Sequence, residues 1–360
     1  MGWAFEIDYR RDELLSGYLR RAAITHGASP FGFMRLHLGD PAFWARDVDR
    51  GVVRRHEAAL SELSGLSSDA IRAMTLQSWV HALWPTRYSD RRPPAITPWV
   101  NATGVFHRLR RRHALQFCPE CLAESETIRK RWRLSFVVAC RRHERMLSDA
   151  CPRCDAPFIP HRSLTRTFRC HVCRHDLAHE PKSDRTSSPP TELVMHTQAS
   201  LYSMLDRAAG CCEVNAATEL HGLRALVAMV LTGPKALVSL RELRVGSHAW
   251  GEGRHRVEIM RLPGRHQILH ACGRLLEEWP YSFRSITDKL GLRQEGFKRY
   301  DPLPAWLGSE VERLPCVKTR SVRKIRSGLD QKLDALHARK PRNWRTTRAA
   351  LMIRAARPWP

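Results

Sequence analysis

The stretch "ACRRHERMLSDACPRC", residues 139–154, holds two pairs of metal-ligating side chains, and two residues separate the members of each pair. Further pairs with the same spacing lie before and after it. The eight paired residues are Cys118, Cys121, Cys140, His143, Cys151, Cys154, Cys170 and Cys173. This spacing suits a tight turn that aims two ligands at one ion, and two such turns complete a tetrahedron. The chain is therefore expected to hold two four-ligand metal sites.

Two ways of combining the four pairs are open. Joining neighbours in sequence gives one site within 118–143 and another within 151–173, so the quoted stretch ends one site and begins the next. A cross-braced arrangement would join the first pair with the third and the second pair with the fourth. The short connection from His143 to Cys151 favours the sequential arrangement.

The ligand types predict the ion and its role. Thiolates with one imidazole favour zinc over magnesium or calcium. Four protein ligands leave no position for an activated water, so both Zn²⁺ ions are expected to be structural. Metal binding of this kind contributes on the order of 10 kcal/mol to the folding of a small module, which can replace a core that Arg-rich loops cannot build.

The charge of the chain bounds its class of partner. Its 360 residues contain 60 Lys and Arg against 36 Asp and Glu, a formal net charge of +24 that attracts anions. DNA or RNA is the first partner to consider, and no apolar run approaches the ~18 residues that would span a membrane. The candidate nucleic-acid contacts are Arg108, Arg110, Arg111, Arg112, Lys318, Arg320, Arg323, Lys324, Arg326, Arg339, Lys340, Arg342 and Arg345.

The remaining sequence predicts a mainly α fold with small zinc-ribbon β elements. Apolar residues at helical spacing predict an N-terminal and a C-terminal helical domain, and the double zinc-ribbon module lies between them. Proline-rich stretches at 85–99 and 179–192 separate these parts. The predicted divisions are 1–84, 100–178, 193–317 and a basic tail, 318–360.

Two helix pairs are predicted near the N-terminus. In the first pair, Ser29 and Pro30 have the character of an N-cap and a first-turn proline. In the second pair, 54–75, a helix ends near Gly65 and another follows at 68–75. This pattern fits a helix-turn-helix whose second helix reads DNA, but any two helices that only pack together give the same pattern, and that interpretation is favoured.

The first residues lack the basic start and apolar centre of a secretory signal, which favours the cytoplasm. Clustered cysteines in that reducing compartment indicate metal ligands, and the unclustered ones are expected to be core thiols: Cys211, Cys212, Cys272 and Cys316. We find no paired carboxylates at ligand spacing, no phosphate-binding glycine loop and no nucleophile elbow. We therefore expect that the protein is not an enzyme.

Residues 117–158, "FCPECLAESETIRKRWRLSFVVACRRHERMLSDACPRCDAPF", resemble the core of TniQ proteins. The resemblance lies in the aromatic before "CPECL", the "RWRLSF" strand leading to a Cys-x-x-His, "LSDACPRC" and the later pair in "FRCHVC". The N-terminal "DELLSGYLRRAAITHGASPFGFMRLHLG" and "LSGLSSDAIRAMTL" are similar to the helical start of that family. The resemblance covers residues 10–178.

This resemblance implies a prokaryotic transposon protein that selects the insertion site. Family members link a target-recognition device to an AAA+ transposition regulator of the TnsC/TniB type, which recruits the transposase. In the TnsD branch the device is the protein's own DNA-binding domains. In other members the protein docks, often as a homodimer, on an RNA-guided CRISPR effector complex. The sequence leaves both branches open, and the alternative function is a stand-alone sequence-specific DNA-binding zinc protein, such as a transcription regulator.

Overall fold

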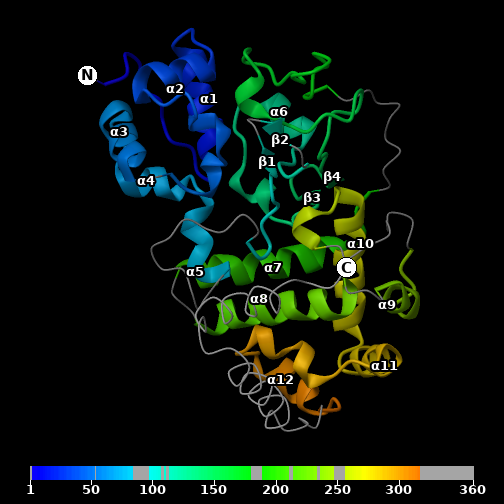
Figure 1. The fold of residues 1–360 in the computed structure, drawn as a ribbon. Coiled ribbons are helices and arrows are strands. Elements are labelled where there is room, and N and C mark those ends of the chain that lie inside the picture. The colour runs from blue at the N-terminus through cyan, green and yellow to red at the C-terminus, as the bar shows by residue number, and fades with distance from the viewer. Residues whose placement is uncertain are drawn as a thin grey trace, which may run out of the picture. The chain divides into compact units, whose positions relative to one another are not determined.

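Helices make up most of the regular structure of this computed structural model (Figure 1). It describes residues 2–52, 54–83, 97–106, 109–110, 113–179, 189–210, 214–232, 236–246 and 256–316. The strands of the described residues form two antiparallel hairpins with two residues in each strand. The predicted fold class, mainly α with small β elements, is confirmed.

The N-terminal part consists of short helices. They are α1 (Leu15–Thr25), α2 (Pro30–Leu38), η1 (Phe43–Ala45), η2 (Val48–Arg50), α3 (Arg54–Ser64), α4 (Ser68–Ala73), η3 (Leu76–Trp79) and α5 (Val80–Leu83). The predicted start of α2 is confirmed, because the Ser29 hydroxyl accepts the Gly32 N–H at 3.1 Å and Pro30 is the first helical residue. Both helix pairs exist, and a DNA-reading role for 68–75 stays a prediction.

The N-terminal helices surround a hydrophobic core of their own. Side chains from α1, α2, η1 and α4 meet in it with at most 3 % of their surface exposed, among them Tyr18, Phe33, Trp44 and Ile71. Helix α1 is buried over most of its length, and its buried apolar side chains belong to this core. Leu14, just before α1, belongs to a second, larger core. The start of α1 therefore lies where the two cores meet.

The middle of the chain contains little regular structure. Its elements are β1 (Val105–Phe106), β2 (Leu109–Arg110), α6 (Pro119–Glu124), η4 (Lys130–Arg133), β3 (Ala139–Cys140), β4 (Arg145–Met146) and η5 (Pro160–Arg162). The strand expected at "RWRLSF" is wrong: a 3₁₀ turn, η4, occupies its first half and only a single bridge joins Val100 to Leu134. Such a turn sends successive side chains in three directions, whereas a strand offers two. Lys130, Trp132 and Arg133 use these directions to reach different buried surroundings.

Longer helices form the C-terminal part. They are α7 (Glu192–Gly210), α8 (Val214–Leu226), a π-helical turn η7 (Val227–Leu231), α9 (Ala236–Glu242), η8 (Val257–Ile259), α10 (Leu262–Glu277), α11 (Tyr281–Leu290), η9 (Gln294–Gly296), η10 (Lys298–Tyr300) and α12 (Ala305–Glu312). Helices α7 and α8 lie side by side, and α10 packs on α7 (Figure 1).

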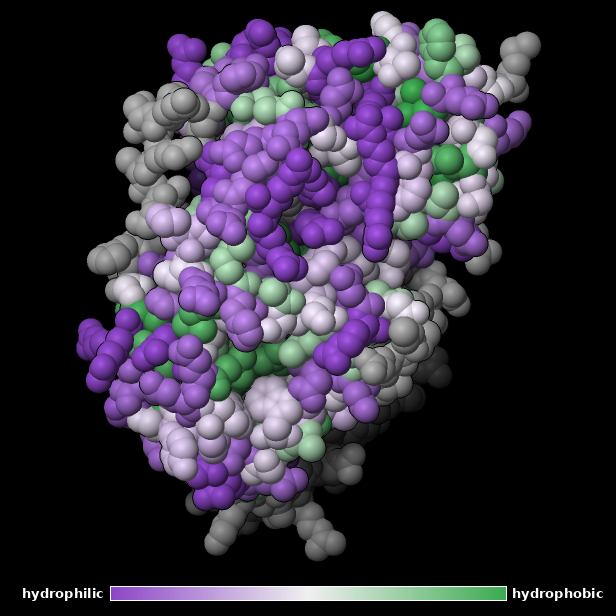
Figure 2. All heavy atoms as spheres, turned by 180° about the vertical axis from the view of Figure 1, so that it is seen from behind, coloured by the Kyte–Doolittle hydropathy of each residue, from purple (hydrophilic) through white to green (hydrophobic). Residues whose placement is uncertain are grey.

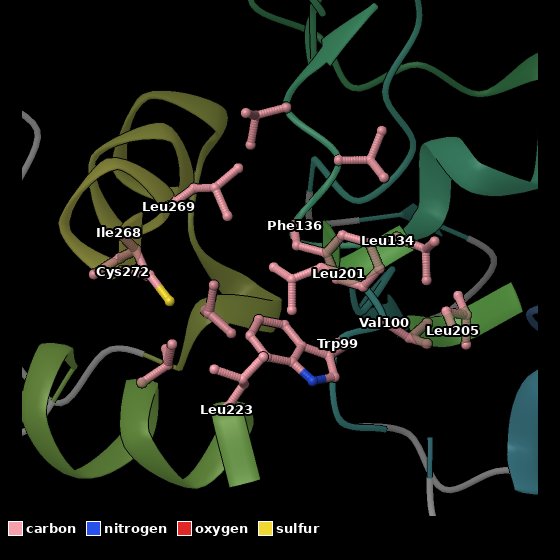
Figure 3. Packing of buried hydrophobic residues seen from close by; sticks show 14 of the residues in the cluster. Trp99, Val100, Leu134, Phe136, Leu201, Leu205, Leu223, Ile268, Leu269 and Cys272 are labelled. Carbon is pink, nitrogen blue, oxygen red and sulfur yellow. The ribbon is translucent and has the colours of Figure 1, made fainter. Parts of the chain in front are cut away.

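The larger core joins the middle of the chain to these helices around Trp99 (Figure 3). Its indole N–H donates to the Leu220 carbonyl at 3.0 Å, and its backbone N–H donates to Glu258 at 3.0 Å. The labelled neighbours in Figure 3 are Val100, Leu134, Phe136, Leu201, Leu205, Leu223, Ile268, Leu269 and Cys272. By its contacts the chain divides into two compact units, Met1–Leu314 and Pro315–Pro360. The finer divisions drawn from sequence stay predictions.

The surface seen from behind is mostly hydrophilic (Figure 2). Strongly hydrophilic residues gather around a hollow in the upper half of that face, and hydrophobic residues are exposed in small areas. Among the described residues, no single helix has the length and apolar composition to cross a membrane; a pair bent by 99°, Asn215–Leu231 with Ala236–Glu242, has both only when taken together.

Candidate metal centres

The first cluster brings together the ligand atoms of Cys118, Cys121, Cys140 and His143, which all lie within 4.8 Å of one another. Cys118 is the N-cap of α6 and Cys121 lies one turn further along that helix, where Pro119 begins it with a preset φ. Cys140 ends β3, and His143 lies in the turn before β4. Helix and hairpin each supply two ligands.

The spacing of these atoms fits a tetrahedral zinc ion. The sulfurs of Cys121 and Cys140 are 3.6 Å apart, and Nδ1 of His143 lies 3.3–3.5 Å from the three sulfurs. A tetrahedron with zinc–sulfur bonds of ~2.3 Å has an edge of about 3.8 Å between sulfurs and a shorter edge to nitrogen. The four atoms therefore surround a space of the right size, and their donor types are those zinc prefers.

The imidazole of His143 is oriented by a carboxylate. Its Nε2 lies 3.0 Å from Oε1 of Glu124, so Nε2–H can donate there and leave the Nδ1 lone pair directed at the sulfurs. The other oxygen of Glu124 pairs with Arg142 at 3.1 Å. Sequence reasoning missed Glu124, although its position one turn after Cys121 on α6 was a usable signal.

In each cluster the neighbouring groups lower the pKa of one thiol, whereas the pKa values of the Cys118, Cys121, Cys151 and Cys154 thiols are raised. Hydrogen bonds from the Cys118 thiol, and to a smaller extent from the Cys121 thiol, hold the pKa of the Cys140 thiol well below its usual value. In the second cluster the backbone N–H of His175 lowers the pKa of Cys173 to about 7. Thiolates are the metal-binding form, so each cluster offers one ready thiolate, and a bound cation would release the protons that the other thiols keep.

The second cluster consists of Cys151, Cys154, Cys170 and Cys173, whose sulfurs also lie within 4.8 Å of one another. The sulfurs of Cys151 and Cys173 are 3.6 Å apart, as are those of Cys154 and Cys170. These distances again match the edge of a tetrahedron around zinc. The structure thus groups the eight residues as neighbours in sequence.

Both halves of the second centre are matching tight turns. The N–H of Asp155 donates to the Cys151 carbonyl at 2.9 Å, and the N–H of Arg174 donates to the Cys170 carbonyl at 3.0 Å. Asp155 and Arg174 each follow the second ligand of a pair and have positive φ, 54° and 63°. Glu144, which follows His143, has φ of 47°. Three of the four pairs therefore close with a left-handed residue that is not glycine.

The two centres are joined by aromatic side chains and a backbone bridge. The ring of Phe117, next to the first ligand, lies 4.9 Å from that of Phe158, which lies 5.8 Å from Phe168. Phe117 and Ser148 exchange two backbone hydrogen bonds of 2.8 Å. The connection between the centres is therefore packed against the entry to the first one.

A buried ion pair fixes the segment between the first centre's ligand pairs to the N-terminal helices. Arg133, with 1 % of its side chain exposed, donates to Asp47 at 2.7 and 3.0 Å and to Asp49 at 3.4 Å. Asp49 also accepts the Ser16 N–H at 2.8 Å and its hydroxyl at 2.9 Å. Interaction with Asp47 and Asp49 raises the pKa of Arg133 despite complete burial, so the guanidinium stays charged.

The second centre has a more exposed anchor. Arg261, at the start of α10, is 46 % exposed and pairs with Asp149 at 3.2 Å and Asp155 at 2.8 Å. The N–H of Leu262 also donates to Asp149 at 2.7 Å. This contact therefore faces water on one side, where an ion pair contributes less to stability.

The predicted nucleic-acid contacts are largely outside the described residues. The whole basic tail falls there, as do Arg108, Arg111 and Arg112; the backbone of Arg110 belongs to β2. Among the unclustered cysteines, Cys272 is buried as expected. Cys316 is exposed, so its prediction as a core thiol is wrong: it lies beyond Leu314, the last core residue. Cys211 and Cys212 lie outside the described residues.

Comparison with known families gives the first centre a context. Residues 4–147 match the family model described as TniQ. This match supports a TniQ-family protein. The TniQ match spans both N-terminal helix pairs and the whole first centre, and it ends four residues before Cys151 begins the second. The TniQ domain supports a transposition-associated targeting protein. No curated protein matches the chain.

Proposed function

We propose that this TniQ protein is a non-catalytic adaptor for target selection in transposition. It links a target-recognition complex, either an RNA-guided CRISPR effector or target DNA itself, to an AAA+ transposition regulator in the cytoplasm. The observation that carries the proposal is the TniQ match over residues 4–147, within which a closed four-ligand centre lies in a shared core.

Two structural zinc ions stabilise the adaptor. Each centre offers four protein ligands, and bound zinc would have no vacant position for a substrate or an activated water. The eight ligands are Cys118, Cys121, Cys140, His143, Cys151, Cys154, Cys170 and Cys173. The role of the metal is to hold the middle of the chain in the shape that partners bind.

The alternative of a stand-alone DNA reader receives no support from α4. This helix has six residues, and its one basic side chain, Arg72, pairs with Glu57 at 2.7 Å and Asp69 at 3.2 Å. A recognition helix needs free donors that can reach base edges in the major groove. The adaptor therefore fits the chain better.

A pull-down from cells that express the tagged protein with the products of its neighbouring genes tests the proposal. We expect an AAA+ ATPase to be recovered, and CRISPR subunits with guide RNA in addition if targeting is RNA-guided. The Cys121→Ser variant is the control, because loss of the first centre should abolish recovery. Recovery of neither an ATPase nor a CRISPR complex by zinc-loaded protein would contradict the proposal.

The basic tail is proposed to contact nucleic-acid phosphates. Deleting 318–360 removes thirteen Lys or Arg against two Asp. Binding to mixed-sequence DNA should weaken, and its dependence on salt should flatten by roughly 0.9 in log–log slope for each lost phosphate contact. A salt slope equal to that of the full chain would reject this role.

A further inference from the structure

A cavity of ≈ 250 Å³ opens beside the first metal centre. It is lined by four arginines, Arg129, Arg131, Arg141 and Arg142, together with Gln198 and Tyr202 from α7 and two ligands of the centre. None of its lining residues is acidic. The cavity therefore combines a concave shape with a high density of guanidinium groups.

Two of the arginines have carboxylate partners and two do not. Arg131 pairs with Asp12, and Arg142 pairs with Glu124 at 3.1 Å. Within the part of the chain that the structure describes, Arg129 and Arg141 form no ion pair with a carboxylate. Zinc bound by three thiolates and a neutral imidazole would leave one net negative charge on the centre, which these two guanidiniums exceed. The pocket is thus left with positive charge that an anion can neutralise.

The walls are fixed before any ligand binds. The Gln198 side chain accepts the N–H groups of Val138 and Ala139 at 2.8 and 3.0 Å and donates to the Ala139 carbonyl at 2.9 Å. The Arg131 guanidinium lies 4.8 Å from the centre of the Tyr202 ring. These contacts hold η4, β3 and α7 together, so little ordering is needed when an anion enters.

We propose that this pocket binds a phosphate group of a single-stranded nucleic acid, with one nucleotide entering the cavity and Arg129 and Arg141 contacting its phosphate. Guanidinium groups form paired hydrogen bonds with phosphate oxygens. The net charge of +24 makes a polyanion the expected partner. The phosphates of a duplex lie on a convex cylinder, whereas a single strand can direct one nucleotide into a concave site beside an aromatic ring. The inference rests on the proposed nucleic-acid contact and gives it a location.

The test compares two double variants of the full-length zinc-loaded protein. Arg129→Gln with Arg141→Gln alters the pocket and leaves the two carboxylate-paired arginines in place. Arg35→Gln with Arg293→Gln removes the same charge from exposed positions elsewhere. Both variants should keep two zinc equivalents and the far-UV circular dichroism of the parent, which shows that they fold.

Fluorescence anisotropy with a labelled single-stranded DNA of about 20 nucleotides measures affinity between about 50 and 200 mM salt. The pocket variant should bind at least about tenfold more weakly, and its log–log salt slope should fall by about 1.4, or 0.7 for each of two lost contacts. The control should change less than half as much. A nucleoside monophosphate at millimolar concentration should compete with the strand for the wild-type protein and the control variant, and not for the pocket variant.

Equal strand affinity of the pocket and control variants would overturn the proposal. So would an unchanged strand affinity with loss of binding to an acidic peptide, which would assign the pocket to a protein partner. If the wild-type chain bound no strand at all, the proposed nucleic-acid contact would fail as well. If the wild-type chain bound the strand and the pocket variant bound it equally well, the pocket proposal alone would fail and the proposed nucleic-acid contact would stand.

Discussion

The two metal centres share their ligand spacing but differ in their surroundings. In the first centre all three sulfurs belong to buried residues, a helix supplies two ligands, and a carboxylate orients the histidine. In the second, two tight turns supply four cysteines: Cys151 and Cys170 are buried in the same core as the first centre, whereas Cys154 is exposed and Cys173 half-buried. The same motif can thus lie inside a core in one place and at the edge of that core in another.

Replacing Cys121 by Ser should have the largest effect. The first centre lies in the core that includes Trp99 and the C-terminal helices. Loss of its ion should lower the free energy of unfolding by on the order of 10 kcal/mol, and because the ligands belong to this core, the whole core should unfold with the centre. We expect a loss of helical circular dichroism and of zinc. A folded variant that retains two zinc equivalents would contradict the prediction that the first centre is needed for the fold of the core.

Replacing Cys154 by Ser should act locally. This exposed ligand lies on the outer side of the second centre, at the edge of the core, and we expect loss of one zinc equivalent while the helical signal and the main unfolding transition are kept. Elemental analysis with thermal unfolding measures both. Loss of both ions and of the helical signal would mean that the two centres fold as one unit.

The ion pairs that anchor the two centres should also differ in how much they stabilise the fold, with the larger contribution at the first centre. Arg133→Ala removes a buried guanidinium that pairs with Asp47 and Asp49, which should lower the free energy of unfolding by about 3–5 kcal/mol. Arg261→Ala breaks an ion pair that is half exposed, and we expect at most about 1 kcal/mol. Urea unfolding of both variants makes the comparison, and equal losses would contradict it.

Glu124→Gln tests the orientation of His143. A glutamine can no longer act as an anionic acceptor for Nε2–H, so the first centre should bind zinc about 10- to 100-fold more weakly while the second is unaffected. Competition with a coloured chelator measures each step. Glu62→Gln, an exposed carboxylate on α3, is the control and should leave zinc affinity within about threefold.

The last prediction concerns a buried cation in η4, Lys130. Burial lowers the pKa of Lys130 to about 8, although its ammonium donates to the Ala73 carbonyl at 2.7 Å. Between pH 8 and 10.5 the unfolded chain therefore holds a proton that the folded chain has released, and stability should rise by on the order of 1–3 kcal/mol. Lys130→Met should lack this rise in urea unfolding. Parallel pH profiles for both proteins would show that Lys130 is not the cause.

Local signals in the sequence predicted much of this structure. The Ser29–Pro30 start of α2 and the paired ligands depend on neighbours within a few residues, and both are found where they were expected. The contact of Arg133 with Asp47 joins positions 86 residues apart, and neither periodicity nor spacing indicates it. The arginine pocket was missed for the same reason: its walls come from η4, β3 and α7, which only the fold brings together.

The left-handed residues Glu144, Asp155 and Arg174 give the metal a part in biosynthesis as well as in stability. Each adopts a backbone conformation that an unconstrained chain avoids by roughly 1 kcal/mol, so a newly made chain will tend to leave these turns open until zinc arrives. The supply of zinc in the cell should therefore set how much of this protein matures. Glycine at the three positions would loosen that dependence.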